Sequence, residues 1–377
     1  MSFREEGGRK KKKILVICPF PEGIAPAQRL KYEQYFDDWR AHGYSVDVSP
    51  FMSRRLFDVA WAKGHLATKV LGTIAGTLRR WRDFLRIRRY DLVYVFLWVT
   101  PLGTSWSERL VRRLARALIY DIDDNVHLGQ QIDDRINPNR LLRYLKGKSK
   151  PITLMRTADY VIASSPFLEE TAKELNRKGR AVYITSSVDV DHFRPRTRRP
   201  DNPRCVIGWT GTFSSQPFID AIAPMLRKLG ETHAFEFRIV GNFDYSMPGV
   251  DLRVVRFDKA REIADLEHFD IGIYPLVDDP FVYGKSGLKA IVYMAMGLPV
   301  VGSDIGTTPL VIRDGENGFL VRTEKDWLEA LKRLIDDPDL RRRMGEQARR
   351  DAVASFSVQA VAGAYRKVLA SVVEKPN

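Results

Sequence analysis

The sequence predicts an α/β protein made of two doubly wound domains in tandem. The chain has 377 residues, which is long enough for two hydrophobic cores. Short apolar runs rich in β-branched residues alternate with helical patterns in two separate series along the chain. Between the two series lies 191–203, a segment rich in proline and charge that is typical of an interdomain linker.

The first series begins with the apolar run Lys13–Cys18, which predicts a buried strand. A proline-rich loop, a helix over 28–40 and a strand over 45–48 follow, and together they start a parallel sheet. Further strands are expected at 92–96, 117–120, 160–163 and 182–185, with helices over 106–116 and 166–178.

The second series begins directly after the linker and ends in helices. Its predicted strands are 206–209, 235–240, 251–255, 271–274, 299–301 and 318–321, with helices over 218–229 and 288–296. We therefore expect an N-terminal domain over 1–194, a C-terminal domain over 195–352 and a closing helix over 353–377 that packs back on the N-terminal domain. Such domains bind ligands at the carboxyl ends of their strands, so the site is expected in a cleft between them.

The excess of positive over negative charge lies in the first half of the chain. Residues 1–199 hold 38 Lys and Arg against 22 Asp and Glu, whereas residues 200–377 hold 23 against 25. A one-sided basic field indicates a polyanionic partner, which can be nucleic acid, a membrane surface or a phosphorylated lipid. The sequence carries no helix-turn-helix, zinc or single-strand-binding signature, which argues against nucleic acid.

The segment 51–90 interrupts the α/β rhythm with arginines and large apolar residues. Ile74, Leu78, Trp81 and Leu85 share one helical face that arginines flank. This composition is typical of an interfacial helix on an anionic membrane, and equally of a surface helix whose apolar face packs on the core. No apolar run reaches transmembrane length and no signal peptide is recognised, so a cytoplasmic location is expected, with peripheral attachment to the inner face of the membrane as one alternative.

The segment around Gly284-Lys-Ser-Gly287 carries the clearest site signal. A strand ends at Pro275, a loop follows, and a helix begins after the two glycines. Glycine lets a backbone approach a ligand closely, and the N–H groups and dipole of a helix N-terminus attract anions. Lys285 adds a full positive charge, so this turn fits a diphosphate; the alternative is a plain turn that caps a helix.

Several stretches in the second half resemble glycosyltransferase family 4, in its donor-binding half. They are Ile207–Gly211, Phe237–Gly241, Asp270–Pro275, Tyr293–Val301 and Asp314–Val321, preceded by Ile162–Leu168 and Ser187–Pro195. Tyr120-Asp-Ile-Asp-Asp124 is similar to a strand-end motif of some bacterial surface-polysaccharide members. The resemblance spans most of the chain, and the order of these modest motifs is more specific than any one of them.

This resemblance implies the GT-B fold, with two Rossmann-like domains around a cleft, and sugar transfer from a nucleotide-sugar to an acceptor with retention of configuration. It implies no metal and no cofactor other than the nucleotide-diphosphate sugar as co-substrate, because basic groups and a helix N-terminus neutralise the leaving diphosphate. Lys285 is the expected catalytic cation of this half. The expected donor-binding residues are Gly211, Thr212, Gly284, Ser286, Gly287, Leu288 and Lys289.

The sequence departs from the family at two positions that usually carry glutamates eight residues apart. Alignment on Met294–Pro299 puts Gly284 and Val292 there, and neither side chain can accept a hydrogen bond from a sugar hydroxyl. Lys285 and Lys289 are expected to take over part of the polar recognition. The alternative is a relative that keeps the fold without the chemistry, as a scaffold in a polysaccharide assembly.

The N-terminal half supplies the remaining candidates. Asp123 stands where family members often carry a histidine, and Asp124 follows it. A carboxylate there can hold a hydroxyl or stabilise oxocarbenium-like charge, or both residues can simply cap a following helix. Glu22, Gly23 and Arg29 are expected to bind the acceptor, for which a saccharide, lipid-linked or part of a surface polysaccharide, is the expected class.

Overall fold

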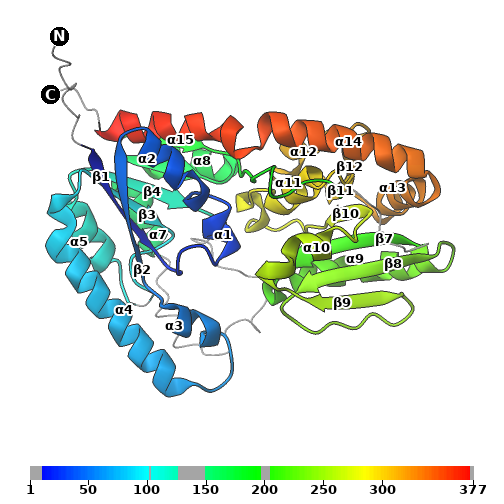
Figure 1. The fold of residues 1–377 in the computed structure, drawn as a ribbon, viewed down its shortest axis with the longest axis horizontal. Coiled ribbons are helices and arrows are strands. Elements are labelled where there is room, and N and C mark those ends of the chain that lie inside the picture. The colour runs from blue at the N-terminus through cyan, green and yellow to red at the C-terminus, as the bar shows by residue number, and fades with distance from the viewer. Residues whose placement is uncertain (1–10, 102, 126–148, 197–203, 374–377) are drawn as a thin grey trace, which may run out of the picture. The chain divides into compact units, whose positions relative to one another are not determined.

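The computed structural model describes residues 11–101, 103–125, 149–196 and 204–373 (Figure 1). The described residues form two compact units, and each is treated separately below. Unit 1 contains those before 185 and those from 362 onward, and unit 2 contains those from 185 to 361.

Unit 1 is built on a parallel sheet with the strand order β2-β1-β3-β4-β5-β6 in the described part of the chain. Its strands are β1 (Lys12–Cys18), β2 (Tyr44–Pro50), β3 (Leu92–Phe96), β4 (Leu118–Ile122), β5 (Tyr160–Ala163) and β6 (Ala181–Tyr183). In the register, Ile14 of β1 lies opposite Val46 of β2 and Leu92 of β3. Continuous apolar runs form the central strands because both faces of this sheet are covered.

The helices of unit 1 connect these strands. They are α1 (Pro26–Arg29), η1 (Glu33–Tyr35), α2 (Phe36–Ala41), α3 (Arg54–Val59), α4 (Leu66–Arg86), η2 (Ile87–Arg89), α5 (Trp106–Leu114), α7 (Ser149–Thr157), α8 (Pro166–Leu175) and α15 (Val358–Val373). The single helix predicted over 28–40 is wrong, because the segment is divided into α1, η1 and α2. Lys31 and Tyr32, between the pieces, are buried, and Lys31 Nζ donates a hydrogen bond to the carbonyl of Ile122 at 2.8 Å.

The last turns of α15 pack on unit 1. The ring of Tyr365 lies 4.5 Å from that of Tyr35 and 6.1 Å from that of Trp39. Arg366 forms an ion pair with Asp38, at 2.5 Å between Nη1 and Oδ1. The chain passes from unit 2 to unit 1 within this helix, at 361–362.

The other boundary between the units falls at 184–185, before the segment 187–194 that the sequence analysis assigned to the N-terminal domain. This segment is fixed to unit 2 through Arg349, whose guanidinium donates to the carbonyls of Phe193 at 2.8 Å and Val190 at 2.9 Å. The N–H of Val188 also donates to the carbonyl of Phe356 at 2.9 Å.

Unit 2 contains a second parallel sheet, with the order β12-β11-β10-β7-β8-β9 among the residues described. Its strands are β7 (Cys205–Gly211), β8 (Phe235–Gly241), β9 (Leu252–Arg256), β10 (Ile271–Tyr274), β11 (Val300–Ser303) and β12 (Gly318–Val321). Its helices are η4 (Phe213–Ser215), α9 (Gln216–Gly230), η5 (Lys259–Arg261), α10 (Glu262–Leu266), η6 (Val282–Gly284), α11 (Leu288–Ala295), α12 (Thr308–Val311), α13 (Glu324–Asp336) and α14 (Pro338–Ser355).

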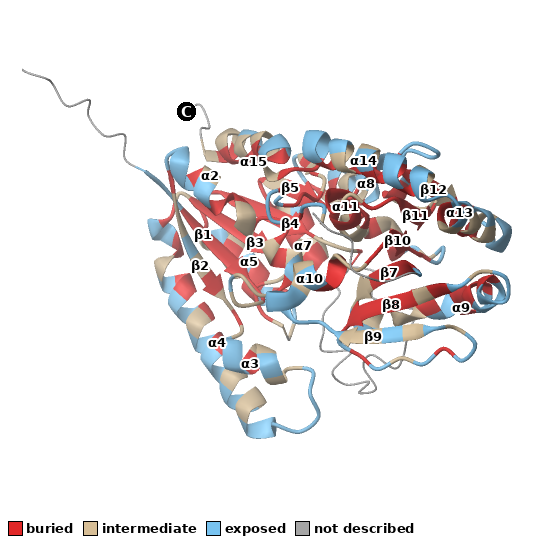
Figure 2. Cartoon of the chain, turned by 45° about the vertical axis from the view of Figure 1, so that its right-hand side comes forward, coloured by how far each residue is buried: buried red, intermediate tan, exposed pale blue. Residues whose placement is uncertain are grey.

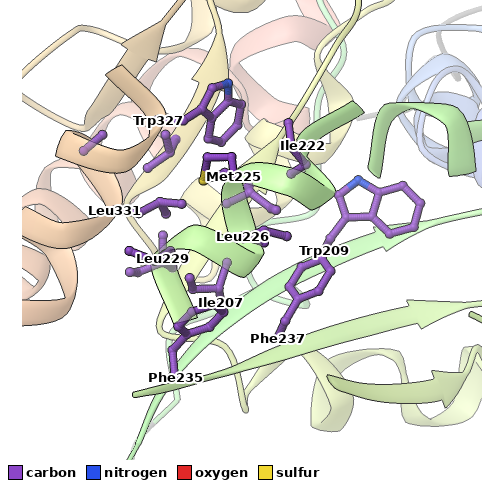
Figure 3. Packing of buried hydrophobic residues seen from close by; sticks show 14 of the residues in the cluster. Ile207, Trp209, Ile222, Met225, Leu226, Leu229, Phe235, Phe237, Trp327 and Leu331 are labelled. Carbon is purple, nitrogen blue, oxygen red and sulfur yellow. The ribbon is translucent and has the colours of Figure 1, made fainter. Parts of the chain in front are cut away.

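The core of unit 2 forms where α9 packs on the sheet. Figure 3 shows Ile222, Leu226 and Leu229 of α9 above the side chains of Ile207 and Phe237. These residues recur at helical spacing on α9 and alternate on the strands, so each element turns one face to the other. The two-domain α/β fold class predicted from the sequence is confirmed by these two sheets.

Candidate functional site

The sheet of unit 2 has its topological switch between β7 and β10. The chain runs outward from β7 to β8 and β9, and then returns to place β10 on the other side of β7. In open α/β sheets, ligands bind outside the carboxyl ends of the strands at such a switch. Gly211 ends β7, and the segment from Pro275 to Gly287 leads from β10 into α11, so both lie at this edge.

Gly287 fixes the start of α11. Its φ of +72° lies in the left-handed region, where it forms the N-cap of the helix without a side-chain hydrogen bond. A Cβ at this position would lie 3.2 Å from Cγ2 of Val311 and 3.3 Å from Oγ1 of Thr307. The hydroxyl of Thr307 also donates a hydrogen bond to the carbonyl of Lys285 at 2.7 Å, which fixes the turn against the N-terminus of α12. Only glycine suits this backbone conformation without strain.

Two lysines place positive charge beside this turn. Lys285 Nζ lies 5.1 Å from the ring centroid of Phe281 and 5.7 Å from that of Phe218. Lys289 Nζ lies 4.4 Å from a ring of Trp209, which is buried at the end of β7. Cation–π contacts of this kind hold an ammonium group in place without neutralising its charge. Together with the dipole of α11, these charges can bind an anion at the carboxyl edge of the sheet.

A buried tyrosine ties α11 to β7. The hydroxyl of Tyr293 accepts a hydrogen bond from the N–H of Thr210 at 2.8 Å and lies 3.1 Å from its Oγ1. Burial raises the pKa of Tyr293 to about 12, although its bonds to Thr210 oppose the shift. Its hydrogen bonds to Thr210 thus fix the position of α11 against the end of β7.

The other donor-site candidates lie on the same two segments. Ser286 and Leu288 flank Gly287 and are half-buried, whereas Gly284 ends η6 and is buried. At the end of β7, a Cβ on Gly211 would collide with the ring of Trp209 at 2.1 Å, and Thr212 is exposed, with its hydroxyl 2.8 Å from that of Ser214.

The position of the second missing glutamate is buried and carries an apolar side chain. Val292 lies on α11 with 9% of its surface exposed. Gly284 and Val292 supply no side-chain oxygen, so polar recognition at this end of unit 2 falls to backbone groups, lysines and hydroxyls.

Unit 1 carries its predicted carboxylates at the equivalent edge of its own sheet, whose switch lies between β1 and β3. Asp123 and Asp124 directly follow β4, and Asp124 has a φ of +56°, which is uncommon for a residue with a side chain. Lys31 Nζ lies 3.8 Å from a carboxylate oxygen of Asp123, whose side chain is 18% exposed. This lysine therefore adds positive charge beside the predicted carboxylate.

A buried ion pair, Lys31 with Asp121, lies next to Asp123 and was not predicted from the sequence. Lys31 Nζ lies 2.7 Å from Oδ1 of Asp121, and the hydroxyl of Tyr94 donates a short hydrogen bond to Oδ2. Burial raises the pKa of the Asp121 carboxyl, while Lys31 and Tyr94 oppose that shift. A carboxylate within the apolar run of β4 was a signal of a buried charge, but its partner Lys31 lies 90 residues earlier in the chain.

The predicted acceptor loop after β1 is held by a second residue that sequence reasoning missed. Glu33 accepts hydrogen bonds from the N–H of Gly23 at 2.7 Å and from Nε2 of Gln28 at 2.9 Å. Gly23 has a φ of +73°, Glu22 is exposed, and Arg29 is half-buried at the end of α1. The carboxylate of Glu33 thus fixes the loop at Gly23 and is itself hydrogen-bonded to Gln28.

The described residues contain neither a candidate metal cluster nor a helix suited to span a membrane. No group of three or more His, Cys, Asp or Glu side chains is arranged there to hold a metal ion. In the same part of the chain, no helix combines the length and the apolar character that crossing a bilayer requires.

Comparison with known protein families gives a match that lies in unit 2. The family described as Glycosyl transferases group 1 matches residues 204–337, which contain all the donor-site candidates. D-inositol 3-phosphate glycosyltransferase of Corynebacterium aurimucosum is 37% identical over 123 residues, which are 31% of this chain and 28% of that protein. MMP alpha-(1->4)-mannosyltransferase of Mycolicibacterium hassiacum is 42% identical over 100 residues, 25% of this chain and 24% of that protein. Matched segments thus span about a quarter of these relatives' length.

Solved structures match over nearly the whole chain. Sucrose-phosphate synthase from Thermosynechococcus elongatus is 17% identical, with a TM-score of 0.69 over 96% of this chain and 100% of that one. HepE of Anabaena, solved in complex with UDP and glucose, is 16% identical, with a TM-score of 0.61 over 96% of this chain and all of that one. At such identities the likeness shows the fold. The chain has the two-domain α/β fold of these structures, GT-B, and its residues 204–337 match the family described as Glycosyl transferases group 1.

Proposed function

We propose that this protein is a glycosyltransferase that moves a sugar from a nucleotide-diphosphate sugar to a saccharide acceptor, with retention of configuration. One observation carries the proposal. A glycine-capped helix begins at the topological switch of unit 2, and two lysines lie beside it, within the segment that matches the Glycosyl transferases group 1 family. A site of this chemistry suits a diphosphate. The UDP and glucose bound to HepE agree with this choice of ligand.

In this proposal, the donor diphosphate binds the backbone of Ser286, Gly287 and Leu288, and Lys285 and Lys289 contribute charge. In the transition state, the bond between the sugar's anomeric carbon and the phosphate oxygen breaks, and negative charge grows on this oxygen. The same groups stabilise that charge on the leaving diphosphate. Basic groups and a helix dipole can supply this stabilisation without a metal ion. No side chain is assigned as a nucleophile, and the donor's own phosphate oxygen acts as the base, by analogy with the family.

Unit 1 supplies the acceptor side of the proposed reaction. Asp123 and Asp124 hold a sugar hydroxyl or stabilise the positive charge that develops on the sugar ring. Lys31 Nζ lies 3.8 Å from Oδ1 of Asp123 and adds positive charge beside it. Glu22, Gly23 and Arg29 contact the acceptor, a lipid-linked or surface-polysaccharide saccharide, and the enzyme acts in the cytoplasm.

One observation favours a second candidate function. Neither Gly284 nor Val292 has the carboxylate that usually contacts the donor sugar or the ribose, and the side chain of Val292 is buried. A protein that keeps the fold but no longer binds the donor would serve as a scaffold in a polysaccharide assembly. Nucleotide binding separates the two candidates, because a scaffold of this kind has no need of it.

The test is turnover with a panel of nucleotide-sugars, measured as release of the nucleoside diphosphate with and without saccharide acceptors. Lys285→Ala is expected to lower kcat/KM about 10- to 100-fold, as expected for the loss of a hydrogen bond to a charged group. Lys325→Ala is the matched control, because its side chain is 82% exposed on α13. If Lys285→Ala turns over as fast as the wild type, the assignment of the donor site to this turn is wrong.

A further inference from the structure

The helix α4 turns its apolar side away from unit 1. Leu71, Ile74, Leu78, Trp81 and Leu85 are 66%, 51%, 63%, 52% and 85% exposed, respectively. Figure 2 shows exposed residues along the length of this helix. A surface helix usually buries such a stripe against its own core, so an exposed stripe of this length needs an explanation.

The opposite side of α4 is the one that packs on unit 1, through the buried residues Gly76, Arg80, Asp83 and Phe84. A Cβ on Gly76 would lie 2.7 Å from the carbonyl oxygen of Phe51, so the helix approaches the backbone closely there. Arg80 and Asp83 are buried and form an ion pair at 3.0 Å. Arg80 also donates to the carbonyl of Val99 at 2.7 Å. The helix is therefore anchored without using its apolar stripe.

The spacing shows that the two sides are opposed. Ile74, Leu78 and Trp81 each precede a buried residue by two positions, namely Gly76, Arg80 and Asp83. Two positions on an α-helix correspond to a rotation of about 200°. The apolar stripe thus points almost directly away from the packing side, and repacking on the same unit would require the buried ion pair to break.

The neighbouring helix α5 extends this surface. Trp106 is 44% exposed, and its ring lies 5.9 Å from that of Trp81 and 5.8 Å from that of Phe84. We call the six side chains of Leu71, Ile74, Leu78, Trp81, Leu85 and Trp106 the α4 face. Two exposed tryptophans at the edge of an aliphatic stripe are typical of a surface that meets the lipid headgroup region.

The charges around the α4 face are of one sign. Arg82 on α4, and Arg109 and Arg113 on α5, are exposed. The acidic side chains of these two helices, Asp83 and Glu108, are both fully buried. The exposed charges of α4 and α5 are therefore all positive, which complements an anionic surface.

We propose that the α4 face is an interfacial docking surface for a bilayer that contains anionic lipids, with the apolar side chains in the headgroup boundary and the arginines on lipid phosphates. A second copy of the chain fits less well, because a two-fold interface would bring this basic rim against itself. A nucleic acid also fits less well, because its phosphates would pair with the arginines but would not bury the aliphatic side chains of the α4 face. The proposal does not depend on the transferase assignment, since no donor-site residue lies on α4 or α5.

The test is sedimentation of the full chain with phosphatidylcholine vesicles, with or without phosphatidylglycerol. The wild type is expected to bind the anionic vesicles, and Ile74→Glu/Leu78→Glu to bind them at least about tenfold more weakly. Both side chains are more than half exposed, so the melting temperature should not change. Leu310→Glu is the matched control, because Leu310 is 56% exposed on α12 of unit 2.

A second variant tests the charges separately. Arg82→Glu is expected to weaken binding to anionic vesicles by roughly fivefold or more, and high salt should weaken wild-type binding in the same way. Equal sedimentation of the wild type and Ile74→Glu/Leu78→Glu would overturn the proposal. So would a dimer of the wild type that the double variant dissociates, or retention on duplex DNA without retention on vesicles.

Discussion

Gly287→Ala tests the turn at which we place the donor diphosphate. The φ of +72° costs an alanine about 1–2 kcal/mol. The new Cβ also meets Val311 at 3.2 Å and Thr307 at 3.3 Å, contacts that small movements of two side chains can relieve. We therefore expect a loss of unfolding free energy of about 1–2 kcal/mol, or about 2–8 °C in the melting temperature.

Gly315→Ala provides the control in the same unit. Gly315 has a φ of +75°, but nothing lies within 4 Å of a Cβ placed there. The backbone cost is therefore the same at both positions, and a similar loss of stability is expected. Only Gly287 lies at the start of α11, where a shift of the first turn would misplace the N–H groups that we assign to the diphosphate.

The assay is calorimetric titration of both variants with nucleoside diphosphates. Gly287→Ala should weaken binding by roughly 2- to 30-fold, the range expected for an anion at a helix N-terminus, whereas Gly315→Ala should bind as the wild type does. If Gly287→Ala loses stability but keeps the wild-type dissociation constant, the diphosphate does not bind at this turn. Equal weakening in both variants would mean that lost stability, and not the turn, explains the effect.

Three other changes test separate parts of the structure. Lys289→Ala should weaken nucleotide binding by up to about tenfold in titrations, because it removes the ammonium held over Trp209, and wild-type affinity would exclude this role. Asp83→Asn should lower the unfolding free energy by about 3 kcal/mol in denaturant titrations, because Arg80 stays buried without its partner, and a loss below about 1 kcal/mol would contradict that reasoning. Burial raises the pKa of Asp159, but hydrogen bonds and charges outweigh it and leave the pKa below its usual value. A carboxyl whose pKa is lowered by folding stabilises the fold above its unfolded pKa of about 3.9 and loses that contribution as pH falls further. Asp159→Asn should therefore make the unfolding free energy less dependent on pH below about pH 4. An unchanged pH dependence in this range would refute the role given to Asp159.

The fold was largely predictable because its signals are local. Buried parallel strands such as Ile14–Cys18 and Ile271–Tyr274 are continuous apolar runs, and these can be recognised without knowledge of their neighbours. The helix expected over 28–40 was not predicted correctly, because Lys31 is held by a carbonyl of β4. A tertiary contact of this kind overrides local helical preference.

The candidate site could be predicted where glycine and charge mark it, and not where partners are distant in sequence. Gly287 and Lys285 were recognised from the turn alone. The ion pair between Lys31 and Asp121 was missed because it joins a residue after α1 to a residue of β4, 90 positions later. Glu33 was missed because its carboxylate accepts a hydrogen bond from the backbone of Gly23, ten residues earlier. Sequence reasoning left the apolar side of α4 open between core and membrane, and the exposure of Leu85 and its neighbours excludes packing on the core of unit 1.

The central claim, that unit 2 binds a nucleoside diphosphate at the start of α11, is tested most directly by a thermal-shift panel. UDP, GDP, ADP, CMP and dTDP are compared with and without magnesium. A ligand at 100 times its dissociation constant adds about 2.7 kcal/mol to the unfolding free energy. We predict that one diphosphate stabilises the protein by such an amount without magnesium, and that Lys285→Ala removes most of the shift. No shift with any nucleotide would contradict the donor site and favour the scaffold.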